Sequence, residues 1–225
     1  MVTFVLVHGG GDVGWYWHLV EAELRARGHD TVAPDLPCED DAAGFDAYAD
    51  TVVDAIGSRG EVALVGHSLG AFTATLVASR LSARSLVLVA GMIPAPGERA
   101  DDWFADTGWQ AAVEEQGRRD GGVTGNADPL VAFYHDVPRP LAEEAMNRGR
   151  GQSDAPGRDP WPLETWPSVS TRFVVCAQDR FFPPGFMRRV VSERLGIVPN
   201  EIDAGHCVAL SRPRELAELL DASIS

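Results

Sequence analysis

The sequence predicts an α/β protein with one sheet of six mainly parallel strands and helices on both of its faces. Short apolar runs rich in β-branched residues alternate along the chain with longer runs of helical periodicity. Such alternation requires crossover connections between parallel strands. The strand runs are apolar at nearly every position, which is typical of strands covered on both faces.

The elements follow one another in a regular order. Strands are expected at residues 2–7, 30–33, 62–66, 85–90, 172–177 and 197–202. Helices are expected at residues 15–27, 45–56, 71–80, 186–195 and 213–220. Gly28 and Gly57 follow the first two helices, at a position where helices commonly end on glycine. We expect the strand order 2-1-3-4-5-6.

The alternation stops between the fourth and fifth strands. Residues 92–167 contain no clear strand, two helical stretches at 103–119 and 141–148, and many Gly, Pro and Asp residues. A structureless loop of this length is improbable in a compact domain. We therefore expect a helical cap, inserted into a single domain of residues 1–225. The cap tryptophans Trp103, Trp109 and Trp161, together with Gly9, are candidate pocket residues, although the tryptophans could equally pack the cap onto the sheet.

The charge balance excludes several function classes. The formal net charge is −14 and the sequence contains no lysine. An acidic surface repels phosphate backbones and anionic lipids, so neither nucleic acid nor a membrane is an expected partner. Schiff-base chemistry and P-loop phosphate binding both need a lysine and are excluded. Neither a metal nor an organic cofactor is implied.

The cysteines and the ends of the predicted elements bear on location. The three cysteines, Cys38, Cys176 and Cys207, are too few and too sparse for a disulfide framework. The first strand begins at residue 2, which leaves no room for a signal peptide, and no apolar stretch is long enough to cross a bilayer. We expect a cytoplasmic protein; the oligomeric state stays open.

A nucleophile motif lies between the third strand and its helix. Residues 66–70, Gly-His-Ser-Leu-Gly, fit the pattern G-x-S-x-G in the strand–turn–helix context that this pattern requires. Glycine at both flanks meets the steric demand of so sharp a turn. Ser68 would then lie at a helix N-terminus, where the backbone N–H groups favour negative charge. The alternative is a plain strand–helix turn that happens to carry serine.

A base and an acid for that serine follow the last two strands. Asp179 comes after the fifth strand and His206 after the sixth. The carboxyl ends of parallel strands share one edge of the sheet, so Ser68, Asp179 and His206 should converge there. The chain order Ser, Asp, His is the one expected for this motif. Asp203, on the same turn as His206, is a weaker candidate for the acid.

The oxyanion of an acyl-transfer reaction needs two backbone N–H donors. One should belong to Leu69, the residue after the nucleophile. The second should come from the glycine-rich loop after the first strand, where we choose Gly10. Glycine lets a substrate approach the backbone closely.

Together these motifs resemble those of the α/β-hydrolase superfamily. The matching residues are His8-Gly9-Gly10, Gly14-Trp15, Gly66 to Gly70, Gln178-Asp179 and Gly205-His206. Within the superfamily the chain is most similar to the small capped esterases grouped with plant methylesterases and hydroxynitrile lyases. The lyases of that group carry a threonine and a lysine where this chain has Gly9 and Cys207. The resemblance therefore implies ester hydrolysis rather than cyanohydrin cleavage, although it assigns no role to Cys207.

Two other functions compete with a serine esterase that cleaves a small, fairly apolar carboxylic ester. Gly9, Gly11 and Gly14 also fit G-x-G-x-x-G, and Asp35 follows about 20 residues later, which is the dinucleotide-binding pattern of an NAD(P)-dependent oxidoreductase. That interpretation leaves the Ser, Asp and His constellation unexplained. The third possibility is a non-catalytic small-molecule receptor that kept the pocket and lost turnover.

Overall fold

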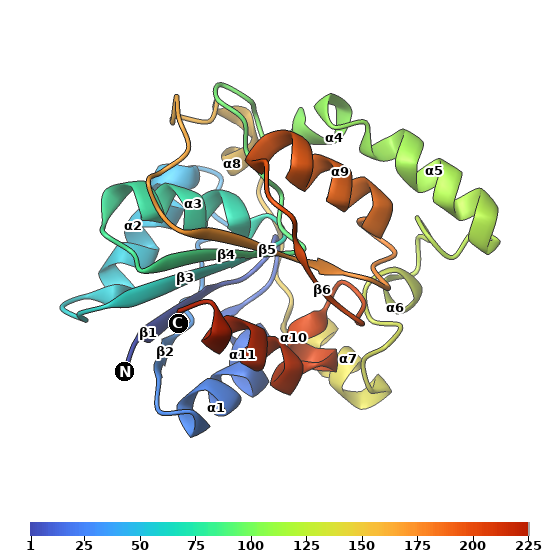
Figure 1. Ribbon diagram of the computed structural model, residues 1–225. Helices are drawn as coiled ribbons and strands as arrows, with labels where there is room; N and C mark the ends of the chain where they lie inside the picture. The colour runs from blue at the N-terminus through green and yellow to red at the C-terminus, as the bar shows by residue number, and fades with distance from the viewer. Residues whose placement is uncertain (225) are drawn as a thin grey trace.

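The computed structural model describes residues 1–224 and contains one six-stranded sheet (Figure 1). Its strands are β1 (Thr3–Val7), β2 (Asp30–Val32), β3 (Val62–His67), β4 (Ser85–Val89), β5 (Thr171–Cys176) and β6 (Asn200–Ile202). All neighbouring pairs are parallel and the order is β2-β1-β3-β4-β5-β6. The predicted fold class and strand order are confirmed.

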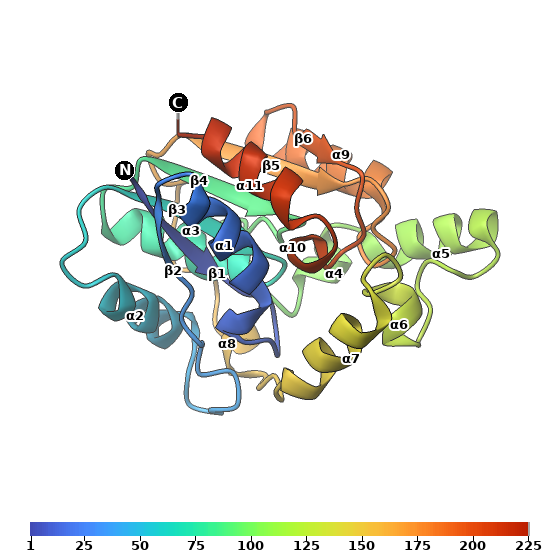
Figure 2. The same ribbon diagram turned by 90° about the horizontal axis from the view of Figure 1, so that it is seen from below.

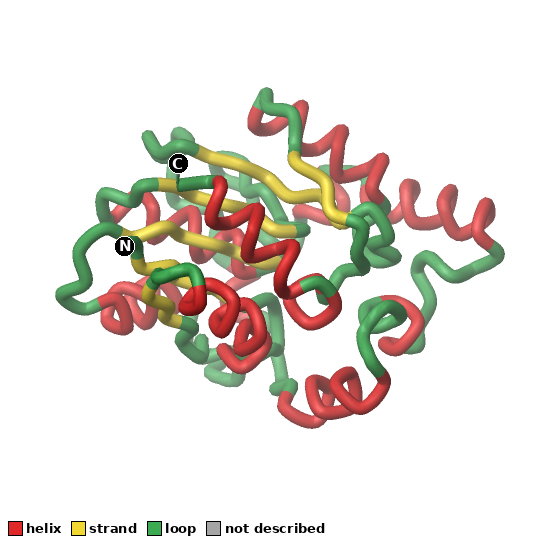
Figure 3. The backbone as a smooth tube through the Cα atoms, turned by 60° about the horizontal axis from the view of Figure 1, so that its bottom comes forward, coloured by secondary structure: helices red, strands yellow, loops and turns green. Residues whose placement is uncertain are grey.

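Helices cover both faces of the sheet, as predicted. One face carries α2 (Phe45–Ile56), α3 (Gly70–Arg80) and α9 (Pro184–Leu195), and the other carries α1 (His18–Ala26) and α11 (Pro213–Ala222) (Figure 1). Figure 3 shows the strands as one layer between these helices. Side chains alternate along β1, so Val5 and Val7 pack in the core under α2 and α3, whereas Phe4 and Leu6 pack under α1 and α11.

Several element boundaries differ from the sequence prediction. The expected helix 15–27 begins with a 3-10 turn, η1 (Gly14–Trp17), before α1. The sixth strand starts at Asn200 rather than at residue 197, because Pro199 has no N–H to donate to the ladder. A short helix after this strand, α10 (Val208–Ser211), was not predicted.

The segment between β4 and β5 is helical, as predicted, but is divided more finely. It contains α4 (Trp103–Asp106), α5 (Trp109–Asp120), α6 (Pro129–Ala132), α7 (Arg139–Arg148) and α8 (Ala155–Arg158). The predicted helix 103–119 is split at Gly108, whose φ of 72° is incompatible with a continuous helix. Figure 2 shows α5, α6 and α7 to one side of the sheet. No helix in residues 1–224 is long and apolar enough to cross a membrane.

Candidate active site

Ser68 lies in the tight turn between β3 and α3. Its φ of 51° falls in the left-handed region, which among the described non-glycine residues occurs only here and at Ala90. The end of β4 holds the turn in place. The Ser68 N–H donates to the carbonyl oxygen of Val89 (3.3 Å), and the Ser68 carbonyl oxygen accepts from the N–H of Met92 (3.0 Å). A strained serine at such a turn is typical of functional sites.

The two flanking glycines of the motif are required by close backbone contacts. A Cβ atom on Gly66 would lie 2.7 Å from Cα of Ala71. On Gly70 it would lie 2.2 Å from the carbonyl oxygen of His8. Any side chain at either position would therefore push the strand away from the helix, and the steric demand expected from the sequence is confirmed.

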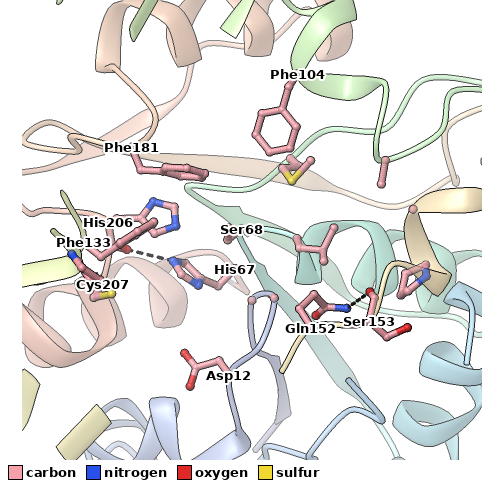
Figure 4. A pocket seen from close by; sticks show the side chains of 18 of the residues that line it. Asp12, His67, Ser68, Phe104, Phe133, Gln152, Ser153, Phe181, His206 and Cys207 are labelled. Atoms are coloured by element: carbon pink, nitrogen blue, oxygen red, sulfur yellow. Dashed lines mark hydrogen bonds between the residues drawn. The ribbon is translucent and has the colours of Figure 1, made fainter. Parts of the chain in front are cut away.

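His206 and Asp179 meet where β5 and β6 end. Nδ1 of His206 lies 2.8 Å from Oδ2 of Asp179, and both residues are buried. His206 and Ser68 border the same cavity (Figure 4). Among residues 1–224 no hydrogen bond joins the Ser68 hydroxyl to the imidazole, and such bonds often tighten only when substrate is bound.

The rival acid, Asp203, points elsewhere. Its Oδ1 accepts a hydrogen bond from Nε2 of Gln178 at 2.9 Å. This contact ties the turn before His206 to the loop that carries Asp179. Of the two candidate acids, Asp179 is therefore the one that contacts the imidazole.

His67, which precedes Ser68 in the chain, holds the backbone of His206 by a hydrogen bond. Its Nε2–H donates to the carbonyl oxygen of His206 (3.0 Å), and its ring stacks on Tyr16 with centroids 4.8 Å apart. Burial holds the pKa of His67 well below its usual range, and the neighbouring His206 lowers it further. A neutral His67 thus fixes the backbone of His206 without adding charge to the site.

The two expected oxyanion donors lie in the cavity wall. Gly10 and Leu69 both line the cavity, and within residues 1–224 neither backbone N–H group donates a hydrogen bond. The loop after β1 is held from outside. The Gly11 N–H donates to Oε1 of Gln152 (3.0 Å), and the Gly11 carbonyl oxygen accepts from the N–H of Arg150 (2.7 Å).

The cavity beside Ser68 has a volume of about 600 Å³ and is largely apolar. Gly9 lies in its wall, as expected from the sequence. The large apolar and aromatic side chains that line it are Met92, Phe104, Phe133, Tyr134, Met146 and Phe181. A cavity of this size fits a small organic molecule.

The tryptophans expected to line the pocket do not do so, and that prediction is wrong for Trp103, Trp109 and Trp161. Indole N–H groups need a partner when buried. Trp103 is fully buried and donates to the carbonyl oxygen of Ile93 (3.0 Å), and Trp109 donates to that of Phe181 (2.8 Å). Trp161 packs edge-on against the ring of Phe72. Trp109 and Trp161 therefore pack the inserted segment against the loop after β5 and against α3, and do not line the cavity.

Comparison with known proteins agrees with this geometry. Residues 4–219 match the family model described as "Alpha/beta hydrolase family". The chain belongs to the alpha/beta hydrolase family. The prediction of a hydrolase is thereby confirmed.

Several known proteins are similar to this hydrolase over nearly its whole length. "Probable esterase PIR7A" of Oryza sativa subsp. japonica is 28% identical over 96% of this chain and 94% of its own length. "Methylesterase 7" of Arabidopsis thaliana is 25% identical over 96% and 94%. The crystal structure of polyneuridine aldehyde esterase superimposes with a TM-score of 0.79 at 22% identity, covering 99% of this chain and 98% of the other.

The dinucleotide-binding interpretation of the glycine-rich loop is not supported. Oδ1 of Asp35, the expected ribose ligand, accepts a hydrogen bond from the Gly14 N–H at 2.7 Å. A Cβ on Gly14 would lie 2.1 Å from the carbonyl oxygen of Ala33. In this hydrolase the glycine spacing therefore serves close packing of the loop against the end of β2.

Two residues of the inserted segment, His135 and Asp136, support the site but are not predicted from the sequence. His135 donates from Nε2 to the carbonyl oxygen of Gln178 (3.0 Å), and Asp136 accepts from the Gly205 N–H (2.7 Å). These contacts hold the loops on which Asp179 and His206 lie. No sequence pattern identifies these two residues, because a histidine and an aspartate in an irregular stretch have no characteristic spacing.

Proposed function

We propose that this hydrolase cleaves small, fairly apolar carboxylic esters through an acyl-enzyme, with Ser68 as nucleophile, His206 as base and Asp179 as orienting acid. The observation that carries the proposal is the 2.8 Å contact between His206 Nδ1 and Asp179 Oδ2, at the cavity that Ser68 borders. A carboxylate on Nδ1 fixes the tautomer whose Nε2 can accept the serine proton.

The reaction proceeds in two acyl transfers. Ser68 Oγ attacks the ester carbonyl while His206 Nε2 takes its proton, and the N–H groups of Gly10 and Leu69 bind the oxyanion. The protonated imidazole then gives its proton to the leaving alcohol. In the second transfer His206 activates a water molecule, which releases the carboxylic acid and restores Ser68.

The size of the cavity and the names of the similar proteins both favour a small ester as the substrate. The cavity of about 600 Å³ has a mainly apolar wall. The names of relatives include esterases and methylesterases. We assign the choice of substrate to residues 92–167, as a cap within the single domain, because this segment supplies Phe104, Phe133 and Met146 to the cavity wall.

The proposal is tested with a fluorophosphonate. Attack of Ser68 Oγ on phosphorus releases fluoride and leaves a stable adduct, so one equivalent of probe should appear on the peptide that contains Ser68. Ser68→Ala should bind no probe and hydrolyse no activated ester. Stoichiometric labelling of another peptide, or none, would overturn the assignment.

A non-catalytic receptor would use the same cavity without turnover. Mixing the protein with an activated ester separates the two functions, since an enzyme releases alcohol repeatedly and a receptor releases none.

We also propose that this hydrolase is located in the cytoplasm. Cys38, Cys176 and Cys207 are all buried as free thiols, which suits a reducing environment.

A further inference from the structure

The charged groups that line the cavity are of one sign. Asp12, Asp101 and Asp154 contribute carboxyl groups to the wall, whereas no arginine of the described chain does. The formal net charge of the whole chain is −14. The potential in the cavity therefore disfavours an anionic substrate and favours a cationic one.

Asp12 is partly buried, whereas Asp101 and Asp154 are exposed, and one of its two carboxylate oxygens is held by the backbone. Its Oδ1 accepts a hydrogen bond from the Val13 N–H at 2.8 Å. Its Oδ2 has no hydrogen-bond partner within residues 1–224. This oxygen is not among the fully buried atoms, and Asp12 lines the cavity. Burial raises the pKa of Asp12 to about 6. A carboxyl group that has lost water and gained one partner binds a further donor favourably.

The charge of Arg150, the nearest guanidinium, acts to lower the pKa of Asp12 but does not outweigh the effect of burial. Nη2 of Arg150 donates to the backbone carbonyl oxygens of Asp12 (3.0 Å) and Leu36 (2.8 Å). No ion pair joins Arg150 to the Asp12 carboxylate in the described part of the chain. The guanidinium supports the loop, and Oδ2 stays available to a ligand.

The Asp12 carboxyl group lies on the same side of Ser68 as Cys207 (Figure 4). Tyr134 and Cys207 lie near Asp12, and Cys207 directly follows His206. Figure 4 shows Gln152 on the other side of Ser68. Because the imidazole protonates the departing oxygen, the alcohol portion of the ester occupies the His206 side.

We propose that Asp12 selects esters whose alcohol portion carries a protonated amine. The inference rests on the proposed esterase function and names its substrate class. Oδ2 of Asp12 accepts the N–H of the ammonium group, and the ring of Phe133 lines the same end of the cavity, where an aromatic face adds a cation–π contact. The acyl portion lies among the apolar side chains on the far side of Ser68.

The test compares esters of equal shape and different charge. Dimethylaminoethyl butanoate, protonated at neutral pH, is compared with isopentyl butanoate, which has a carbon in place of the nitrogen. Hydroxyethyl butanoate and propyl butanoate form a second pair, in which the donor is neutral. We expect kcat/KM to favour the ammonium ester by about tenfold or more, and the hydroxyl ester by less, because hydrogen bonds to charged groups are the stronger ones.

Asp12→Asn removes the charge while its side-chain oxygen can still accept from the Val13 N–H. In this variant the ratio of kcat/KM for the ammonium and isopentyl esters should fall to within about twofold of unity. Asp54→Asn is the matched control, because Asp54 is an exposed carboxylate on α2 that does not line the cavity, and it should leave the ratio near that of the wild type. Melting temperatures verify that both variants are folded.

The pH dependence of the same ratio tests Asp12 without a mutation. Any effect of pH that the two esters share cancels in the ratio, so protonation of Asp12 should lower the preference as the pH falls through about 6. The other ionisable groups that face Asp12 are Tyr16, Asp35, Tyr134, Arg150 and Cys207. Burial raises the pKa of both tyrosines and of the thiol, so these three stay neutral in this range.

The outcomes separate this inference from the esterase proposal. Equal hydrolysis of the ammonium and isopentyl esters, or a preference that survives in Asp12→Asn, overturns the role of Asp12 and leaves the esterase intact. A ratio that does not change between about pH 5 and about pH 8 does the same. No hydrolysis of any of the four esters, together with no fluorophosphonate labelling of Ser68, overturns both.

Discussion

Nδ1 of His206 lies 2.8 Å from Oδ2 of Asp179, at the carboxyl ends of two neighbouring strands. The other carboxylate oxygen, Oδ1, accepts the N–H groups of Phe181 (2.8 Å) and Phe182 (2.9 Å). Both oxygens are therefore engaged, and the carboxylate cannot rotate without losing hydrogen bonds. The imidazole is held with its proton on Nδ1 and with Nε2 free to act as a base.

This arrangement predicts the effect of Asp179→Asn. The amide oxygen must accept the two backbone N–H groups, so the NH2 group would face His206 and donate to Nδ1. The imidazole would then carry its proton on Nε2, which is the wrong tautomer. We expect turnover to fall by about three to four decades while the fold stays nearly intact, as measured by ester hydrolysis and circular dichroism.

Asp203→Asn is the control for that variant. Its carboxylate bonds to the side chain of Gln178 rather than to the imidazole, and an amide oxygen can accept the same hydrogen bond. We expect activity within about threefold of the wild type. A crippled Asp203→Asn beside a nearly normal Asp179→Asn would show that the wrong acid is assigned, and would leave Ser68 and His206 unaffected.

The sheet and the three loops at its edge could be predicted because each depends on local patterns. The apolar runs fix the strands, and parallel strands put Ser68, Asp179 and His206 at one edge whatever the details of packing. The steric requirement for glycine at positions 66 and 70 could be predicted for the same reason, because it follows from the tight turn itself.

The inserted segment could not be predicted to the same depth, because its contacts are long-range. Trp103 and Phe104 are neighbours in the sequence, yet the indole is buried against Phe182 and only the phenyl ring lines the cavity. Periodicity cannot distinguish these two sides in a helix of four residues. The contacts from Arg150 and Gln152 to the loop after β1 depend on that same tertiary placement.

Burial of His8 should make the free energy of unfolding depend on pH. The ring of His8 is fully buried, donates from Nδ1 to the Gly9 carbonyl oxygen (2.8 Å) and accepts the Leu36 N–H at Nε2 (3.0 Å). Burial lowers the pKa of His8 to about 4. The unfolded chain binds a proton near pH 6.5, which the folded protein binds only near pH 4, so stability is lost as the pH falls through this window.

The measurement is the free energy of unfolding in denaturant, for the wild type and for His8→Gln. The difference between the two should shrink by about 3 kcal/mol from pH 7 to pH 4. Asp12→Asn provides a control of opposite sign, because burial raises the pKa of Asp12 to about 6 and the folded state gains a proton first. A difference for His8→Gln that does not vary with pH would contradict a buried neutral His8.

The last prediction concerns Gln152, whose Oε1 accepts the Gly11 N–H at 3.0 Å and so steadies the loop that carries the Gly10 N–H. Outright loss of an oxyanion donor costs about 10²- to 10³-fold in kcat, and loosening one should cost less, so we expect Gln152→Ala to lower kcat about tenfold and KM to change little. Inhibition by a trifluoromethyl ketone, whose adduct with Ser68 bears an oxyanion, should weaken in the same proportion. Gln110→Ala, on the exposed face of α5, is the control. Unchanged kcat and Ki in Gln152→Ala would show that the loop keeps its position without this side chain.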